Sequence, residues 1–347
     1  AAPVQLCEAR AAGGTCRAVI VNSGNANCAT GERGAKDAEK MAAIAAGAVG
    51  VDAREVLVAS TGVIGEPLPV DKIAAGAPAL AEGLRSDGFT DLARAMMTTD
   101  TVPKAEVRSG EIDGKTVTLA AVAKGAGMIR PDMATMLSFV CTDAAAAAGD
   151  LKPMLKAACD RSFNRISIDG DTSTNDTVLL MANGVSGVEL DTDVKKAAFQ
   201  TLLDEILLDL AKQLVRDGEG VTKLVAVNVT GAASSQDALR VADTVAHSPL
   251  VKTAFFGEDA NWGRIIAAAG RSGIALDPDR LDIYFDEIQM AAAGRGCGED
   301  AEAKATAVMK KAEYAVTIDL NAGEAEASLL TCDFSVEYVK INADYRS

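Results

Sequence analysis

Histidine is nearly absent from this sequence, since His247 is the only one among 347 residues. A Ser-His-Asp triad and a histidine-based zinc site both depend on imidazole side chains. One histidine makes either hard to build, and we interpret His247 as a helix-capping or surface residue. An acyl-transfer enzyme with this sequence would therefore need a base of another kind.

Positive charge and long apolar runs are also scarce. Lys and Arg number 34 against 49 Asp and Glu, which gives a net charge of −15. Binding to nucleic-acid phosphates needs a basic surface. Gly, Asp or Lys interrupts the longest apolar runs, and none reaches the roughly 18 residues of a membrane span. No basic-then-apolar leader opens the sequence. We expect a protein that neither binds nucleic acid nor enters a membrane.

Aromatic residues make up only 4% of the chain, whereas hydrophobic residues reach 49%. This composition is typical of a tightly packed α/β protein, and the length allows one large or two medium domains. The seven cysteines include no CxxC pair. Such cysteines act as small hydrophobic residues and suit the reducing cytoplasm. We therefore predict a cytoplasmic location.

Hydrophobic periodicity predicts alternating strands and helices. Helices are expected at 34–49, 71–84, 90–97, 151–160, 194–216 and 237–246. Strands are expected at 17–22, 55–59, 137–141, 177–181, 223–229, 251–256, 281–285, 314–320, 327–332 and 336–341, with a hairpin over 107–122. The pattern indicates one continuous α/β body with a mainly antiparallel sheet.

Thr135 stands between a glycine-rich loop and the apolar run 137–141. A threonine hydroxyl is a weak nucleophile until a base activates it. If the bond before Thr135 is cut, its new α-amine has a reference pKa of about 8. That value suits a general base at neutral pH. The alternative is an ordinary threonine in a turn before a core strand.

Two further polar segments are candidates for binding or catalysis. The predicted strand 55–59 runs into Thr61 and Gly62, where backbone N–H groups could stabilise an oxyanion. The alternative is a turn that uses glycine for its dihedral angles. The polar loop 164–176 is long for a structureless connection, which indicates a function. It lacks the glutamate and flanking helices of an EF-hand, so we predict no metal. Glu258 follows the predicted strand 251–256, at an expected strand-to-helix junction.

Eight short motifs, spread in order over nearly the whole chain, together resemble one family, the arginine-biosynthesis ornithine acetyltransferases. These enzymes are also called bifunctional glutamate N-acetyltransferases. The motifs are Asn22-Ser23-Gly24-Asn25-Ala26-Asn27, Ser60-Thr61-Gly62-Val63-Ile64-Gly65, Thr98-Thr99-Asp100-Thr101, Lys124-Gly125-Ala126-Gly127-Met128-Ile129, Met133-Ala134-Thr135-Met136-Leu137, Asp169-Gly170-Asp171-Thr172-Ser173-Thr174-Asn175-Asp176, Gly257-Glu258-Asp259-Ala260-Asn261-Trp262-Gly263-Arg264 and Asn342-Ala343-Asp344-Tyr345-Arg346.

The resemblance implies a precursor that cuts itself between Ala134 and Thr135. It implies an α chain of residues 1–134, a β chain of residues 135–347 and an α2β2 assembly. Family members carry more residues before the position of Ala1, so the α chain is expected to be truncated at its start. The implied fold is a layered αββα-like sandwich with mainly antiparallel sheets, related to the DmpA-type self-processing aminopeptidases.

The resemblance also implies the reaction, in which an acetyl group moves from N2-acetyl-L-ornithine to L-glutamate through acetyl-Thr135. No cofactor is implied, and the sequence leaves open whether acetyl-CoA is a second donor. The implied nucleophile is Thr135, and the implied oxyanion hole is Thr61 with Gly62. The residues implied to contact substrate are Thr98 or Thr99, Lys124, Thr135, Glu258, Asn342 and Ser347.

Two other functions are compatible with the residues. One is a self-processing aminopeptidase on the same fold, which would not need the tail from Asn342 to Ser347 to hold an amino acid. The other is a non-enzymatic α/β protein whose polar loops are only turns. Two fragments that meet at Thr135 would favour either enzyme over the non-enzymatic protein.

Overall fold

The computed structural model describes residues 1–130 and 136–344. The chain divides into two compact units, of which the first contains Ala1–Asn164 and Asp171–Leu214. Of the described residues, the second contains Arg165–Gly170 and 215–344. The expectation of one continuous body was wrong, because each unit buries hydrophobic clusters of its own. Across the two described ranges, no helix combines the length and the apolar character needed to cross a membrane.

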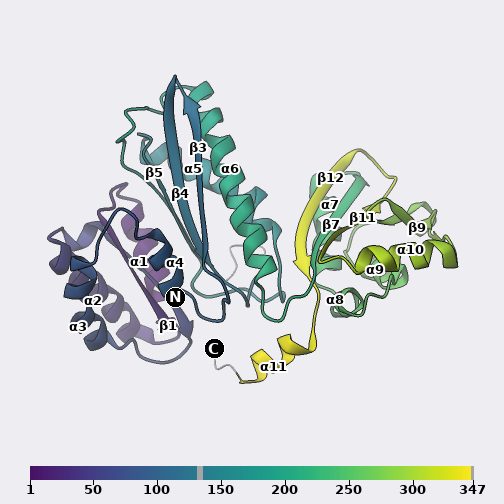
Figure 1. Ribbon diagram of the computed structural model, residues 1–347, viewed down its shortest axis with the longest axis horizontal. Coiled ribbons are helices and arrows are strands. Elements are labelled where there is room, and N and C mark those ends of the chain that lie inside the picture. The colour runs from purple at the N-terminus through teal and green to yellow at the C-terminus, as the bar shows by residue number, and fades with distance from the viewer. Residues whose placement is uncertain (131–135, 345–347) are drawn as a thin grey trace. The chain divides into compact units, whose positions relative to one another are not determined.

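The first unit contains two sheets (Figure 1). The smaller sheet pairs two parallel strands, β1 (Ala18–Asn25) and β2 (Val56–Val63). The larger sheet has the order β3 (Lys104–Ile112), β4 (Lys115–Lys124), β5 (Leu137–Thr142) and β6 (Thr177–Ala182). In the larger sheet β3, β4 and β5 are antiparallel, whereas β5 and β6 are parallel.

The helices of the first unit are α1 (Ala2–Ala11), α2 (Gly31–Val49), α3 (Val70–Glu82), α4 (Phe89–Ala95), α5 (Ala148–Arg161) and α6 (Asp193–Arg216). Short 3-10 turns precede β2 at Ala53–Glu55 and follow α5 at Phe163–Arg165. α6 ends at the boundary of the unit, with Leu214 as its last residue there.

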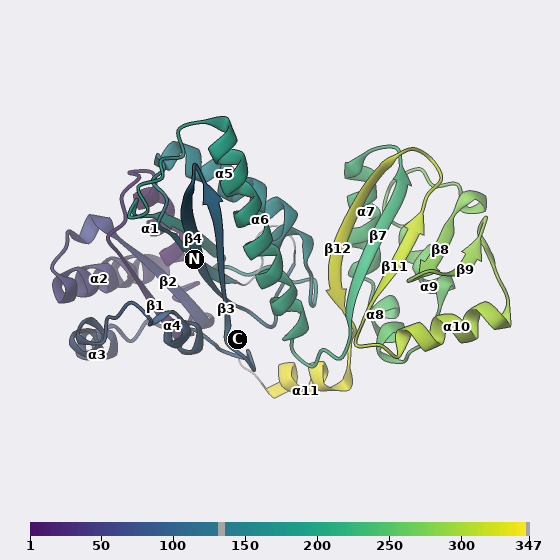
Figure 2. The ribbon, with the colours of Figure 1, turned by 45° about the horizontal axis from the view of Figure 1, so that its top comes forward.

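The two sheets of the first unit lie between helices (Figure 2). Ala59 of β2 and Phe139 of β5 share one buried cluster between the sheets. Met41 of α2 belongs to the cluster on the helix side of the smaller sheet. On the other side, Leu202 of α6 packs over Gly110 of β3. Helices therefore lie on both outer sides of the two sheets in this unit.

The second unit is built on one six-stranded sheet with the order β10-β9-β8-β11-β7-β12. Only the β11–β7 pair is parallel. The strands are β7 (Leu224–Ala232), β8 (Asp282–Phe285), β9 (Ile288–Ala292), β10 (Arg295–Gly296), β11 (Glu313–Asp319) and β12 (Ala325–Cys332). The helices are α7 (Ser235–Ala246), α8 (Pro249–Phe256), α9 (Trp262–Gly270), α10 (Glu299–Met309) and α11 (Val336–Asp344), with a 3-10 turn at Pro278–Arg280.

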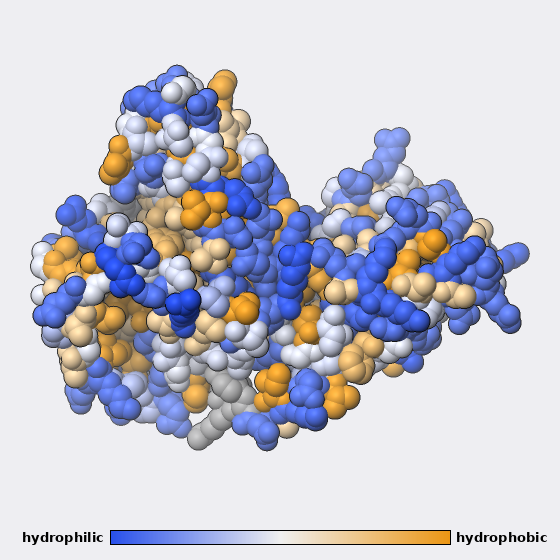
Figure 3. Space-filling view, viewed as in Figure 1, coloured by the Kyte–Doolittle hydropathy of each residue, from blue (hydrophilic) through white to orange (hydrophobic). Residues whose placement is uncertain are grey.

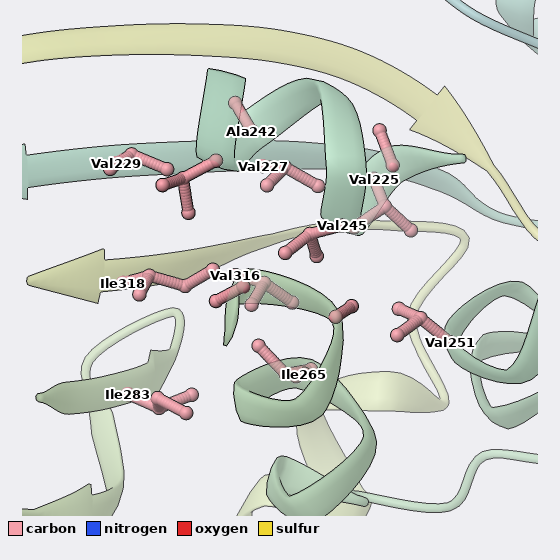
Figure 4. Close-up of a cluster of buried hydrophobic side chains, with 14 of the residues drawn as sticks. Val225, Val227, Val229, Ala242, Val245, Val251, Ile265, Ile283, Val316 and Ile318 are labelled. Carbon is pink, nitrogen blue, oxygen red and sulfur yellow. The ribbon is translucent and has the colours of Figure 1, made fainter. Parts of the chain in front are cut away.

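Alternate residues of β7 and β11 form the core of the second unit (Figure 4). Val225 and Val227 of β7 lie beside Val316 of β11, as the two-residue period of a strand requires. Val245 of α7 and Ile265 of α9 cover them.

On the face seen in Figure 3, apolar residues lie in small groups among hydrophilic ones. The prediction of a mixed α/β fold with mainly antiparallel sheets is confirmed.

Two predicted strands were wrong. The segment 251–256 belongs to α8, which begins with Pro249. Proline fits the first turn of a helix, because its missing N–H needs no partner there. Buried and exposed residues then alternate with a helical period, since Val251 and Phe255 are buried and Phe256 is partly exposed. The segment 336–341 belongs to α11, in which Val336 and Val339 are exposed, so its alternating sequence reflects no buried strand face.

Candidate functional site

Lys124, the last residue of β4, lies between the two sheets of the first unit. It pairs with Leu137 of β5. Its Nζ donates hydrogen bonds to Oγ1 of Thr98 at 2.8 Å and to Oγ1 of Thr61 at 3.2 Å. Lys124 is only 2% exposed, so its charge acts in a poorly solvated place. The structure thus brings together three of the predicted site residues.

Thr98 is distinguished from Thr99 by this contact with Lys124. The sequence left open which of the two belongs to the site, and the hydroxyl of Thr98 is the one that Lys124 reaches. The backbone N–H of Thr98 donates to Oδ2 of Asp100 at 3.1 Å. Both the side chain and the backbone of Thr98 are therefore fixed by buried charged groups.

Asp100 joins two buried lysines and the start of the glycine-rich loop. Its Oδ1 accepts hydrogen bonds from Nζ of Lys104 and from the N–H of Gly125, both at 2.7 Å. Burial raises the pKa of Asp100, but the charges of Lys124 and Lys104 outweigh it and hold that pKa below its usual value. Asp100 lies in one of the eight motifs, but no role was predicted for it. A carboxylate four residues before a lysine, inside a matched motif, was the available signal.

Gly62 brings its strand unusually close to β1. Its φ is 128°, and it pairs with Gly24 in the parallel register. A Cβ at position 62 would lie 2.3 Å from the carbonyl carbon of Gly24, so only glycine fits. The Thr61–Gly62 peptide is consequently held in one place, as a preorganised oxyanion site requires.

The predicted nucleophile and cleavage site, Thr135 and Ala134, lie outside the described residues. The described chain resumes at Met136, whose N–H donates to Oδ1 of Asp176 at 3.0 Å. Burial raises the pKa of Asp176 to about 8, although the hydrogen bond from Met136 and the charge of Lys124 act in the opposite direction. The carboxyl group of Asp176, which titrates near neutral pH, therefore contacts Met136, the residue that follows the predicted nucleophile in the sequence.

Glu258 belongs to the second unit and lies between α8 and α9, so the predicted strand-to-helix junction was wrong. It has a positive φ of 54°, which is uncommon for a residue with a side chain. Nζ of Lys223 lies 2.8 Å from Oε1 of Glu258. The hydrogen bond from Lys223 is the main reason that the pKa of Glu258 falls below its usual value. Its side chain is 36% exposed, so it is available as an anionic contact.

Asn342, also in the second unit, lies inside α11 and does not follow a strand as we expected. Its Nδ2 donates to Oε2 of Glu219 at 2.7 Å and to the carbonyl oxygen of Tyr338 at 3.0 Å. Because Glu219 is buried, its hydrogen bond fixes the position of the Asn342 side-chain amide. Ser347, the other predicted tail contact, lies outside the described residues.

His247 is the C-cap residue of α7, and the predicted capping role is confirmed. Its Nε2 lies 2.7 Å from Oγ of Ser167, and its Nδ1 lies 3.0 Å from Oδ1 of Asp243. The order resembles a Ser-His-Asp triad. However, Ser167 is 0% exposed, so its hydroxyl offers a substrate no access. The arrangement therefore fixes the end of α7. Among the described residues, no three His, Cys, Asp or Glu side chains are grouped to hold a metal ion.

The sequence matches known proteins along its full length. The model of the ArgJ family matches residues 1–347. The "Arginine biosynthesis bifunctional protein ArgJ" of Geobacter sulfurreducens is 53% identical over 349 residues, which cover 100% of this chain and 89% of that protein. The protein of the same name from Symbiobacterium thermophilum is 51% identical over 349 residues, which cover 100% and 87%.

A solved structure is similar to part of the chain. The crystal structure of the arginine biosynthesis bifunctional protein argJ from Bacillus halodurans matches with a TM-score of 0.57 and 44% identity. The match covers 60% of this chain and 98% of that one. The family resemblance inferred from the eight motifs is confirmed, and because the family model and the relatives match over every residue, this chain belongs to the ArgJ family.

Proposed function

We propose that this chain is a self-cleaving acetyltransferase of arginine biosynthesis, which moves an acetyl group from N2-acetyl-L-ornithine to L-glutamate. The observation that carries the proposal is the buried contact of Lys124 with Thr98 and Thr61, next to the constrained Gly62. β5 pairs with Lys124 at Leu137, two residues after Thr135 in the sequence. The names of the relatives, arginine biosynthesis bifunctional protein, support the same pathway.

The first step is self-cleavage. The hydroxyl of Thr135 attacks the carbonyl carbon of Ala134, and an ester replaces the amide while the α-nitrogen of Thr135 takes a proton. Water then hydrolyses the ester and releases an N-terminal threonine. The products are an α chain of residues 1–134 and a β chain of residues 135–347. The proposed fold relationship is with the DmpA-type self-processing aminopeptidases, and the proposed assembly is α2β2 in the cytoplasm.

The second step is acyl transfer. The α-amine of Thr135 takes the hydroxyl proton, directly or through one water, and the oxygen attacks the acetyl carbonyl of N-acetylornithine. The hydroxyl of Thr61 and the backbone N–H of Gly62 stabilise the oxyanion, and one such donor is worth roughly 3–4 kcal/mol. Ornithine leaves with a proton, and the amine of glutamate then takes the acetyl group from Thr135. No cofactor is needed.

Lys124 and Glu258 are proposed to recognise different charged groups of the substrate. Lys124 is a buried cation that suits the substrate carboxylate, and Thr98 beside it adds a hydroxyl. Glu258, which is ionised and partly exposed, suits the side-chain amine of ornithine. Asn342 and Ser347 are the proposed contacts from the C-terminal tail. We propose acetyl-CoA as a second acetyl donor, which would make the chain bifunctional.

A self-processing aminopeptidase is the second candidate, and the match of the ArgJ family to residues 1–347 favours the acetyltransferase. Mass spectrometry of the purified protein tests cleavage, with two fragments that meet at Thr135 as the expected result. Glutamate acetylation is then assayed with N-acetylornithine and with acetyl-CoA separately. Peptide hydrolysis without acetyl transfer would favour the aminopeptidase, and one uncleaved, inactive chain would contradict both enzymes.

A further inference from the structure

Asn175, from the polar loop before β6, holds the end of the smaller sheet beside Thr61. Its Nδ2 donates to the carbonyl oxygen of Ala26 at 2.6 Å and to that of Ser60 at 3.0 Å. Ser60 directly precedes Thr61 in β2, and Ala26 directly follows β1. Asn175 is 5% exposed. One buried amide therefore bridges the two parallel strands at the proposed oxyanion hole.

The orientation of the Asn175 amide is fixed from its other end. Oδ1 of Asn175 accepts a hydrogen bond from the hydroxyl of Thr174 at 2.6 Å. The backbone N–H of Asn175 donates to Oγ of Ser173 at 3.1 Å. With two carbonyl oxygens on one side and a hydroxyl donor on the other, only an amide satisfies every partner.

Asp176, the next residue, holds the strand that follows the predicted nucleophile. Its Oδ1 accepts from the N–H of Met136 at 3.0 Å, and the N–H of Thr177 donates to the carbonyl oxygen of Met136 at 3.0 Å. Met136 is 2% exposed. Both polar backbone groups of Met136 are thus bound by two adjacent residues, Asp176 at the end of the loop and Thr177 at the start of β6.

Asn175 and Asp176 share one peptide bond, so their α-carbons are fixed at about 3.8 Å from each other. One side chain holds Ser60, the neighbour of Thr61, and the other holds Met136, the neighbour of Thr135. We infer that Asn175 and Asp176 are positioning residues, which set the strand of the oxyanion hole against the strand that begins after the nucleophile. This inference rests on the proposed function.

The chemistry explains why such a link matters. Acyl transfer requires that the oxyanion donors and the nucleophile stand in one fixed geometry, and a displacement of about 1 Å can cost about 100-fold in rate. The side chains of Asn175 and Asp176 are both short, so they allow little displacement of β2 relative to β5. The polar loop that we expected to have a function therefore acts through the two strands that it holds.

Four single variants of the full chain test the inference. Asn175→Asp keeps the shape but places a carboxylate against two carbonyl oxygens, and Asp176→Leu removes the acceptor for Met136. We expect each to lower kcat for acetyl transfer at least about tenfold and to change KM less than about threefold. Asp176→Asn keeps an acceptor oxygen and should retain most of the wild-type kcat. The control variant is Ser186→Ala. The Ser186 hydroxyl, in another loop of the same unit, donates a hydrogen bond to the carbonyl oxygen of Asp143, so this variant measures the effect of losing one hydrogen bond elsewhere.

Hydrogen exchange gives a readout that does not depend on activity. In Asp176→Leu the N–H of Met136 should exchange at least about tenfold faster than in the wild type, while the amides of β4 keep their protection. A variant that has lost protection throughout the sheet is unfolded, and the test then rests on Asn175→Asp and Asp176→Asn.

The outcomes separate this inference from the proposed function. A wild-type protein that transfers no acetyl group contradicts the proposed function, whereas the exchange result still tests the link. An active wild type with folded Asn175→Asp and Asp176→Leu variants of normal kcat overturns the inference. Asp176→Asn as impaired as Asp176→Leu would also overturn it, because the carboxyl proton or charge, and not position, would then be what matters.

Discussion

Nζ of Lys124 lies 2.8 Å from Oγ1 of Thr98, although 26 residues separate them in the sequence. The contact exists because β4 ends between the two sheets of the first unit, where α4 and the loop after it also arrive. Asp100 then fixes the loop through Lys104 and Gly125. A cationic and hydroxyl-lined site is therefore assembled from three separate segments, and each segment can be tested by itself.

The nucleophile is tested first. Thr135→Ala should give one uncleaved chain without transferase activity, because the proposed cleavage and transfer use the same hydroxyl. Thr135→Ser keeps a hydroxyl and should retain part of both. Mass spectrometry and an acetyl-transfer assay provide the measurements. Two chains from Thr135→Ala would show that another residue performs the cleavage.

The oxyanion hole is tested at Thr61. Thr61→Ala should lower kcat by about 100-fold and raise KM far less, because the stabilising contact strengthens in the transition state. Thr61→Ser keeps the hydroxyl that accepts from Lys124 and serves as the matched control. An effect confined to KM would mean that Thr61 only binds substrate.

Asp100 should be essential for stability. Asp100→Asn removes the negative charge from two buried lysines, and breaking a buried ion pair typically costs about 3–5 kcal/mol. Thermal unfolding at pH 7 should show a clear fall in Tm. The double variant Asp100→Asn with Lys104→Met should recover part of the loss, because one of the two buried positive charges is gone. Equal Tm values for wild type and Asp100→Asn would contradict this account.

The pH dependence at Asp100 has a definite sign. The folded pKa of Asp100 is lowered, so its stabilisation is present above the ordinary aspartate pKa of about 4 and is lost as pH falls through the folded value. The Tm difference between wild type and Asp100→Asn should therefore shrink below about pH 4. A difference that stays constant down to acid pH would mean that charge is not the cause.

Asp176 should behave in the opposite way. Its folded pKa is about 8, so the folded state binds a proton that the unfolded state has already released above about pH 4. The free energy of unfolding of the wild type should therefore fall, relative to that of Asp176→Asn, as pH rises from about 4 to 8. Denaturant unfolding of both proteins at pH 5 and pH 8 measures the difference. A gap between them that does not grow with pH would show that Asp176 ionises normally.

The C-terminal tail is the last test. Removing Tyr345, Arg346 and Ser347 should leave cleavage before Thr135 intact, because that reaction needs no bound ornithine. It should weaken kcat/KM for N-acetylornithine at least tenfold, or about 1.4 kcal/mol. The proposed substrate contacts of Asn342 and Ser347 are the reason, and Asn342 is anchored to Glu219 from within α11. A cleaved and kinetically normal truncated enzyme would show that the tail is dispensable.

The sequence predicted most strands and helices, because their hydrophobic periods are strong. The failures have physical causes. α8 and α11 contain β-branched and aromatic residues in an order that also fits a strand, and only tertiary packing decides between the two. The helix expected after Glu258 is α9, whereas helices α1 and α10 were not predicted. α10 has many alanines and acidic residues, so its apolar face is hard to recognise.

The site was harder to predict than the fold. The end of a predicted strand marked Thr61 as a candidate, but Lys124 could be named only through the family resemblance. The two residues are 63 positions apart, and sheet register, not local pattern, brings them together. The roles of Asp100 and Asp176 escaped the sequence analysis for the same reason. Asp176 meets Met136 across 40 residues, at a point that no periodicity marks.

The pairing of β4 with β5 has a consequence for how such a protein is made. A cut before Thr135 leaves β4 on one product and β5 on the other, so a single hydrogen-bonded sheet spans both polypeptides from Leu119 to Thr142. Neither product can complete that sheet alone, and separation would leave two open strand edges exposed to aggregation. Folding before the proposed cleavage would therefore let both products share this sheet, whereas cleavage before folding would leave each of them with an open strand edge.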